Sequence, residues 1–329
     1  MTEGHGDDIY RYGNIDYNFS SNIYGAADLS ALEQYLCQHI DTIRHYPDPT
    51  PARLEAALAR YHGIDTAEVM VTNGATEAIY LIAQAYRPLA GTYTVYHPTF
   101  SEYGDASHAM RYVAADHGHL AWICCPNNPT GEVLTIEQLQ DMARRSRWLV
   151  IDQSYEDYTL RPVPTAAQAL AMGNVMQLHS MTKRYAVPGL RLGYITAPAP
   201  LLAPLRSLTR PWAIGALPLL AGEWLVEHGT PAVPDKEAYL AESQRMQQRL
   251  AQVEGLTVQP SDTNFCLCAF HRHNAASLKE YLVTKHRMLI RDASNFPTLT
   301  PRHFRVAALT PEADDALAEA ITQFIEQDR

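Results

Sequence analysis

Lys183 lies in the stretch of this sequence that points most directly to chemistry. It closes the run Ser180-Met181-Thr182-Lys183, in which two residues carry hydroxyls, and Arg191 comes eight residues later. A lysine amine can form a Schiff base with an aldehyde, and an arginine beside hydroxyls can bind a phosphate. These are the groups that an enzyme holding pyridoxal phosphate would need. Because lysines are usually solvated surface charges, the interpretation depends on the rest of the chain.

Gly74, Ala75 and Thr76 could form a second part of a phosphate site. They follow the apolar run Val69-Met70-Val71 and open a predicted helix. Free backbone N–H groups at a helix start can hold an anion, and small residues leave room for it. Any strand-to-helix turn exposes such groups, so the pattern alone is weak.

Asp152 and Tyr155 follow an apolar run that ends at Ile151. A carboxylate fixed at the end of a strand can keep the ring nitrogen of a cofactor protonated, so that the ring accepts electrons from a substrate. The other interpretation is that Asp152 caps a helix. Spacing alone leaves both open.

Asn128 and Phe100 lie in two proline-containing loops. The string from Pro126 to Gly131 is so rich in turn-forming residues that it predicts a rigid turn after a strand. Asn128 could donate a hydrogen bond to a cofactor phenolate, and Phe100 could face a planar ring. The alternatives are a pure turn role for the asparagine and a core position for the phenylalanine.

Arg291 and Arg305 each interrupt apolar, strand-like sequence in the C-terminal part of the chain. A guanidinium in such a place needs a carboxylate or phosphate partner, from a substrate or from the protein itself. An internal ion pair and an edge position that reaches solvent are the alternatives.

The elements that would position these residues alternate between strand and helix from about residue 50 to 200. This alternation is typical of βαβ units and a mostly parallel sheet, with functional side chains at the carboxyl ends of the strands. Helices are predicted over residues 75–86 and 235–253, and a third helix is predicted to begin at Pro311, with Thr310 as its N-cap. Prolines at 198, 200, 204, 211 and 218 interrupt regular helix and mark a domain connection. The predicted strands are residues 69–71, 93–96, 121–125, 148–151, 175–178 and 192–196.

The composition is that of a globular protein. With 329 residues, 47% of them hydrophobic and 19% charged, we expect one large domain and a smaller one. The net charge of -10 disfavours nucleic acid as a partner. The polar stretch from Met1 to Asp8 predicts no signal sequence, and no run is apolar enough to span a membrane. The cysteines at 37, 124, 125, 266 and 268 predict buried, reduced thiols in a cytoplasmic protein.

Taken in order, these strings resemble the class I/II aminotransferases of pyridoxal phosphate fold type I. Within them, the chain is similar to the branch of histidinol-phosphate aminotransferase and threonine-phosphate decarboxylase over nearly its whole length. The resemblance implies an α/β fold with three regions: an N-terminal segment (1–45) that joins the small domain, a large cofactor-binding domain (46–205) with a mostly parallel seven-stranded sheet, and a connecting helix with a smaller α+β domain (206–329). It rests on Tyr46-Pro47-Asp48, residues 73–79, Pro98-Thr99-Phe100, residues 126–131, Asp152 with Tyr155, residues 180–183, Arg191 and Phe304-Arg305-Val306.

The resemblance also implies a role for each candidate residue. Lys183 would form the Schiff base with pyridoxal phosphate, Asp152 would pair with the ring nitrogen, and Phe100 would stack on the ring. Tyr155 and Asn128 would bind the ring hydroxyl oxygen. Tyr46 would reach the cofactor phosphate of the neighbouring subunit in a homodimer with shared sites. The cofactor's own phosphate would lie on Gly74, Ala75, Thr76, Ser180, Thr182 and Arg191, and the substrate on Arg305, Arg291 and Asn22.

The implied reaction moves an amino group between an L-amino acid, or a phosphorylated amino compound such as histidinol phosphate, and a 2-oxo acid. The alternative is decarboxylation of a substrate like threonine phosphate, because Phe19-Ser20-Ser21-Asn22-Ile23 and residues 290–296 resemble that enzyme. Two positions depart from the family: Tyr24-Gly25 replaces a proline and a second asparagine, and Phe100 replaces a tyrosine. The angle of the substrate carboxylate decides between the reactions, and the sequence leaves it open.

Three other classes fit less well. Acyl enzymes with a Ser-x-x-Lys motif carry a Lys-Thr-Gly downstream, which this chain lacks. A non-catalytic regulator would need a basic recognition helix, and the first forty-odd residues contain none. The close pairs His117 with His119 and His271 with His273 lack a third ligand nearby, so we expect no metal site.

Overall fold

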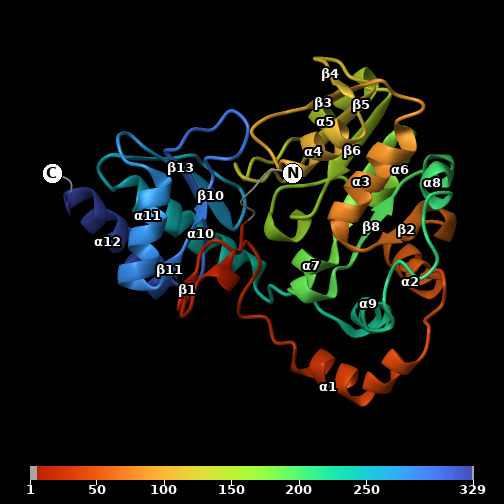
Figure 1. The fold of residues 1–329 in the computed structure, drawn as a ribbon, viewed down its shortest axis with the longest axis horizontal. Coiled ribbons are helices and arrows are strands. Elements are labelled where there is room, and N and C mark those ends of the chain that lie inside the picture. Colours follow the sequence, from red (N-terminus) through yellow and green to blue (C-terminus); the bar gives the residue numbers. More distant parts are fainter. Residues whose placement is uncertain (1–5, 328–329) are drawn as a thin grey trace.

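The computed structural model describes residues 6–327 of the chain. The polar N-terminal stretch that predicts no signal sequence therefore falls largely outside the described residues. Figure 1 shows a large part, whose helices surround a sheet, beside a smaller part that ends in the C-terminal helix. Within residues 6–327, no helix is both long and apolar enough to cross a membrane.

Seven strands form the sheet of the large part, in the order β2-β8-β7-β6-β5-β3-β4. β8 runs antiparallel to β2 and β7, and the other neighbours are parallel. This confirms the predicted α/β class with a large, mostly parallel sheet. The strands are β2 (Val69–Thr72), β3 (Thr92–Val95), β4 (Val113–Ala114), β5 (Leu120–Cys124), β6 (Trp148–Asp152), β7 (Val175–Ser180) and β8 (Gly193–Thr196).

The central strands are buried on both faces. Alternate residues of β5 and β6 belong to different cores, with Trp122 and Val150 in one and Ile123 and Ile151 in the other. Strands covered on both sides read as continuous apolar runs, which is why the sequence predicts them well. The parallel register places Cys124 beside Asp152, so the polar ends of the strands meet at one edge of the sheet.

Helices cover these two faces and extend the large part. They are α1 (Ser30–Gln38), α2 (Ala52–His62), α3 (Gly74–Tyr86), α4 (Glu102–Ala109), α5 (Ile136–Arg145), α6 (Ala166–Leu170), α7 (Met181–Arg184), α8 (Ala199–Arg206) and α9 (Ala216–His228). Short 3₁₀ helices also occur. The first, η1 (Ile9–Arg11), lies in the N-terminal segment, and the others lie between the elements named above: η2 (Ile40–Arg44), η3 (Thr66–Glu68), η4 (Glu156–Tyr158) and η5 (Pro188–Leu190).

The prediction that prolines interrupt regular helix after residue 197 is wrong in part. Two helices, α8 and α9, occupy most of this region. Pro200 and Pro218 lie in the first turns of these helices, where a missing N–H removes no helical hydrogen bond. Only Pro204 lies inside a helix. α9 packs on α2, with Leu219 and Leu54 in the same core.

A four-stranded antiparallel sheet, in the order β12-β13-β10-β9, forms the small part with three helices. β1 (Tyr17–Asn18) pairs in parallel with β11 (Met288–Leu289), so the N-terminal segment contacts this part. The domain boundaries at residues 46 and 206 stay predictions. The other elements are β9 (Leu256–Val258), β10 (Phe265–Phe270), β12 (Arg291–Asp292), β13 (His303–Ala307), α10 (Lys236–Ala251), α11 (Ala275–Tyr281), the π-helical η6 (Leu282–His286) and α12 (Pro311–Gln327).

Two smaller predictions have different outcomes. The Thr310 hydroxyl accepts a hydrogen bond from the Ala313 N–H at 3.3 Å, which confirms it as the cap of α12. Of the cysteines, which are all unpaired thiols, Cys37 is exposed and the other four are buried. The prediction that the cysteines are buried is therefore wrong for Cys37. This residue lies on α1, in which Leu32 is the buried residue.

Candidate active site

One cavity of about 360 Å³ gathers most of the predicted residues. It lies where the carboxyl edge of the large sheet meets the small part and the N-terminal segment. The large part contributes Ala75, Thr76, Phe100, Asn128, Asp152, Tyr155, Ser180, Thr182, Lys183 and Arg191, and the other parts contribute Asn22 and Arg305. Gly74 lies directly against Arg191, while Tyr46 and Arg291 lie outside this cavity.

Lys183 reaches the cavity from α7, which begins directly after β7. Its Nζ donates to the Asn22 Oδ1 at 3.1 Å and lies 5.6 Å from the centre of the Tyr155 ring. Burial lowers the pKa of Lys183 to about 8, with a further contribution from Arg305 and a smaller one from Arg191. About a tenth of this amine is therefore neutral at pH 7, and the neutral form is the one that acts as a nucleophile or base.

Gly74 lets the Arg191 guanidinium approach the backbone at the start of α3. Its φ is +81°, and a Cβ at this position would lie 2.7 Å from an Arg191 Nη atom. A Cβ on Gly193 would lie 2.7 Å from the Ala75 backbone nitrogen. The arginine thus packs on the bare backbone of a helix start, where free N–H groups favour a phosphate. The hydroxyl residues Ser180 and Thr182 line the same end of the cavity.

Asp152 ends β6, and other groups fix both of its oxygens. Oδ1 accepts from the Ser154 N–H at 2.9 Å, and Oδ2 accepts from the Tyr103 hydroxyl at 2.7 Å. Tyr103 is not among the residues predicted from the sequence. It lies in the first turn of α4, three residues after Phe100, which is the residue proposed to stack on the ring. Burial raises the pKa of Tyr103 well above its usual value, so it stays a neutral donor to the carboxylate.

Asn22 links the N-terminal segment to the residues around Lys183. Its Nδ2 donates to the Tyr155 hydroxyl at 2.5 Å, while its Oδ1 accepts from Lys183. Its backbone oxygen accepts from Asn264 at 3.4 Å. Burial raises the pKa of Tyr155, so its hydroxyl also stays protonated.

Arg305 and Arg291 are direct neighbours across β13 and β12. Arg305 donates to the Asn128 Oδ1 at 2.5 Å and to the Ser20 backbone oxygen at 2.8 Å. Its buried Nε has no hydrogen-bond partner among the described residues. Arg291 donates to the Asn295 Oδ1 at 2.8 Å and shares a small adjoining cavity of about 40 Å³ with Arg305.

The loop from Pro126 to Gly131 forms the predicted turn. Asn127 braces it, donating to the Pro98 oxygen at 2.9 Å and accepting from the Thr99 hydroxyl at 2.7 Å. Because the Oδ1 of Asn128 accepts from Arg305, its Nδ2 is the group left for a ligand. Phe100 lines the cavity, with its ring edge-on to that of Tyr103 at 5.8 Å.

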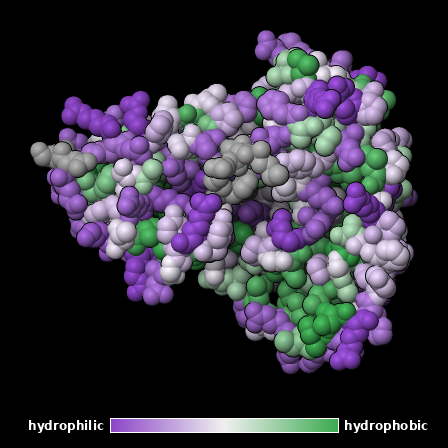
Figure 2. All heavy atoms as spheres, in the orientation of Figure 1, coloured by the Kyte–Doolittle hydropathy of each residue, from purple (hydrophilic) through white to green (hydrophobic). Residues whose placement is uncertain are grey.

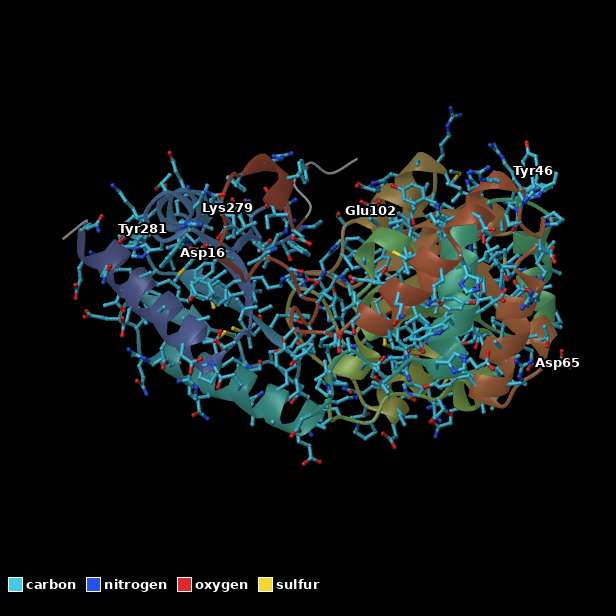
Figure 3. The ribbon with its side chains drawn as sticks, turned by 90° about the horizontal axis from the view of Figure 1, so that it is seen from below. Asp16, Tyr46, Asp65, Glu102, Lys279 and Tyr281 are labelled. Carbon is cyan, nitrogen blue, oxygen red and sulfur yellow. The ribbon has the colours of Figure 1, made fainter. Side chains whose placement is uncertain are left out.

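Tyr46 is 86% exposed and lies at the outer edge of the large part, far from the small part that carries Lys279 (Figure 3). Its ring is 5.3 Å from that of Trp212. A contact with a cofactor would require a second subunit, so its role stays a prediction.

The residues present fit pyridoxal phosphate. A glycine-lined cradle with an arginine suits the phosphate, and a partly buried amine of lowered pKa suits the aldehyde. An oriented carboxylate suits a ring nitrogen, and the unpartnered Nε of Arg305 suits a carboxylate ligand. Among residues 6–327, no group of three or more His, Cys, Asp or Glu side chains is placed to hold a metal ion.

Residues 105–321 match the family described as "Aminotransferase class I and II". The chain belongs to this family. Its cofactor is pyridoxal phosphate. The fold is that of the fold type I enzymes, and the chain falls in the predicted branch.

Three relatives illustrate the branch. Threonine-phosphate decarboxylase from Salmonella typhimurium is 29% identical over 330 residues, covering 92% of this chain and 90% of that protein. Histidinol-phosphate aminotransferase from Caldanaerobacter subterraneus subsp. tengcongensis is 27% identical over 304 residues, covering 85% and 84%. The crystal structure of L-threonine-O-3-phosphate decarboxylase from Porphyromonas gingivalis has a TM-score of 0.89 at 30% identity, covering 94% and 99%.

Proposed function

We propose that this enzyme is an aminotransferase that moves an amino group between an L-amino acid, or a phosphorylated amino compound such as histidinol phosphate, and a 2-oxo acid. The observation that carries the proposal is the partly buried Lys183 amine, which lies in one cavity with Asp152 and Arg305. The family and its aminotransferase relatives support the same class of reaction.

When bound, pyridoxal phosphate supplies an aldehyde for the substrate amine and a ring that accepts electrons from the substrate Cα. The glycine-lined cradle with Arg191 would hold its phosphate, and Asp152 its ring nitrogen. The Nδ2 of Asn128 and the hydroxyl of Tyr155 would bind its ring oxygen, with Phe100 against the ring face. These contacts orient the cofactor while Lys183 remains free to act.

Lys183 would serve as the base at the substrate Cα. Its lowered pKa keeps part of the amine neutral, so its Nζ can take a proton and return it to a neighbouring carbon. Asn22 accepts a hydrogen bond from this Nζ and so sets the direction of the amine. Arg305 would bind the substrate carboxylate through its free Nε, and the orientation of that carboxylate determines which Cα bond breaks.

Decarboxylation is the second candidate. The similarity to threonine-phosphate decarboxylase in both sequence and structure favours it. The contacts of Arg305 are compatible with either reaction, because Asn128 and Ser20 hold the guanidinium without fixing the plane of a bound carboxylate.

A direct assay separates the two candidates. The cofactor-loaded enzyme is incubated with L-histidinol phosphate, or a panel of L-amino acids, plus 2-oxoglutarate, and separately with L-threonine phosphate. Glutamate formation without CO2 is the expected result. Release of CO2 without glutamate would instead establish the decarboxylase.

We also propose that the enzyme works as a cytoplasmic homodimer. Ile40, Ile43, Tyr46 and Trp212 are large apolar side chains that are at least half exposed. Figure 2 has hydrophobic residues gathered on the surface near α1 and α9, and such patches favour association. Sedimentation analysis at micromolar concentration should give twice the chain mass, and a monomer would contradict the proposal.

A further inference from the structure

The hydroxyl of Tyr158 joins Lys183 to the N-terminal segment. Its oxygen donates to the Lys183 backbone oxygen at 3.0 Å and accepts from the Tyr24 N–H at 2.9 Å. Tyr158 ends η4, which follows the strand that carries Asp152, and its side chain is 1% exposed. Three separate stretches of the chain therefore meet at one buried hydroxyl.

This hydroxyl supplies a partner to a carbonyl at the end of a very short helix. α7 has four residues, and the last carbonyls of a helix have no partner within it. A carbonyl shielded from water is costly without a hydrogen bond, so the contact stabilises the position of the Lys183 backbone. Burial raises the pKa of Tyr158, so its hydroxyl stays protonated and can donate.

The amine of Lys183 is bound to the same part of the N-terminal segment. Its Nζ donates to the Asn22 Oδ1 at 3.1 Å, and Asn22 precedes Tyr24 by two residues. Together with the bridge through Tyr158, these contacts form a closed ring. The backbone and the amine of the lysine are thus both held against residues 22–24.

The ring of Tyr158 is held by packing and not by its hydroxyl. It lies edge-on to the rings of Tyr155 and Tyr239, with 6.5 Å between ring centres in each case. All three belong to one hydrophobic core together with Phe265 and Phe304. A phenylalanine at position 158 would fill the same space, so the hydroxyl can be removed without leaving a cavity.

We propose that Tyr158 is a positioning residue for the reactive amine: its hydroxyl fixes the Lys183 backbone relative to residues 22–24 and so keeps Nζ placed for reaction. A small displacement of a reacting group lowers a rate strongly, because correct placement supplies much of the acceleration in an enzyme. This inference rests on the proposed function, since it concerns the amine that acts there as nucleophile and base.

Tyr158→Phe tests the role of the hydroxyl. The full chain, freed of cofactor, is mixed rapidly with pyridoxal phosphate, and Schiff base formation is followed by visible absorption. We expect its rate to fall about tenfold, and kcat to fall by a similar factor with KM for the amino donor within about twofold. Tyr112→Phe is the control, because its buried hydroxyl donates to the Ala83 backbone oxygen at 2.9 Å in the core of the large part.

A second substitution tests whether Tyr158 acts through residues 22–24. Asn22→Ala removes the other link of the ring of contacts. If the two links work together, Tyr158→Phe should slow Schiff base formation by less than about twofold in an enzyme that already carries Asn22→Ala. Effects of the two substitutions that simply multiply would overturn the inference, because they would show that the contacts act independently.

A rate in Tyr158→Phe within about twofold of that of the unaltered enzyme would also overturn it. So would an equal loss in Tyr112→Phe, which would indicate a general loss of stability. Schiff base formation precedes the choice of reaction, so its rate does not depend on which reaction follows. If Tyr158→Phe shows the tenfold loss but the unaltered enzyme forms no glutamate from any amino donor, the proposed function is contradicted and this inference is not.

Discussion

The two ends of the cavity are assembled from different parts of the chain. The residues of the cofactor end lie between positions 74 and 191, and most of them lie at the end of a strand of the large sheet or in the loop or helix that follows it. The substrate end brings together Asp7, Asn22 and Arg305, from the N-terminal segment and the small part, and Arg291 lies beside it in the small adjoining cavity. Strand ends in a rigid sheet hold the cofactor in place. Residues at the substrate end can therefore be replaced without disturbing the cofactor. This division predicts that substitutions at one end should leave the function of the other intact.

Arg305→Ala should have the largest effect at the substrate end. It removes the proposed carboxylate partner and leaves the Asn128 Oδ1 and the Ser20 oxygen without their donor. We expect kcat/KM for the amino donor to fall by about 100-fold or more, with cofactor affinity unchanged. Steady-state kinetics and a cofactor titration measure the two quantities. Arg302→Ala, at an exposed arginine before the same strand, is the matched control.

Gly74→Ala tests the cofactor end in the same way. The new Cβ would meet Arg191 at 2.7 Å in a strained backbone conformation. We expect cofactor affinity to fall by about tenfold, while KM for the amino donor in the saturated enzyme stays unchanged. Gly63→Ala provides the control, since Gly63 has a φ of +67° but no atom near the added Cβ. If the control loses cofactor affinity equally, backbone strain alone is responsible.

Tyr103→Phe tests whether the groups behind the cofactor tune it. Loss of the hydroxyl leaves Asp152 Oδ2 without this donor, so the carboxylate is oriented less firmly and supports the ring nitrogen less well. We expect kcat to fall by about tenfold, with a shift in the pH dependence of the bound cofactor's visible absorption. Tyr86→Phe is the control, because it removes a buried hydroxyl that donates to the Leu201 backbone oxygen at 3.0 Å, away from Asp152. Equal spectra in the two variants would refute the tuning role.

His62 should give the smallest effect, and it concerns the scaffold behind the cofactor end. Its Nε2 lies 2.8 Å from the Tyr194 hydroxyl, and burial followed by His179 lowers its pKa to about 4. The folded state therefore prefers the neutral ring, so stability is full above the unfolded pKa of about 6.5 and is lost as the pH falls towards 4. Between pH 6.5 and 4.5 the free energy of unfolding should fall for both proteins. We expect this fall to be smaller in His62→Gln than in the unaltered enzyme, by on the order of 1 kcal/mol, as measured by urea unfolding. Parallel pH profiles for the two proteins would contradict this assignment.

The same division explains what the sequence could predict. Asp152 and Lys183 each follow a predicted strand. The carboxyl ends of parallel strands lie at the same edge of a sheet, so the proximity of these two residues could be predicted. Tyr103 could not be assigned, because a tyrosine inside a helix gives no sign of the carboxylate it faces. Asp7 gave no signal either: its position depends on the pairing of Tyr17–Asn18 with Met288–Leu289, which joins segments about 270 residues apart. The prolines misled because their effect depends on where in a helix they fall.

The identity of the reactive amine is the central claim, and one measurement tests it most directly. The cofactor-loaded enzyme is reduced with borohydride and digested, and its cofactor-bearing peptide is sequenced. We predict a single labelled peptide that contains Lys183, and no stable label in Lys183→Ala. A label on any other lysine, or full turnover by Lys183→Ala, would contradict the account.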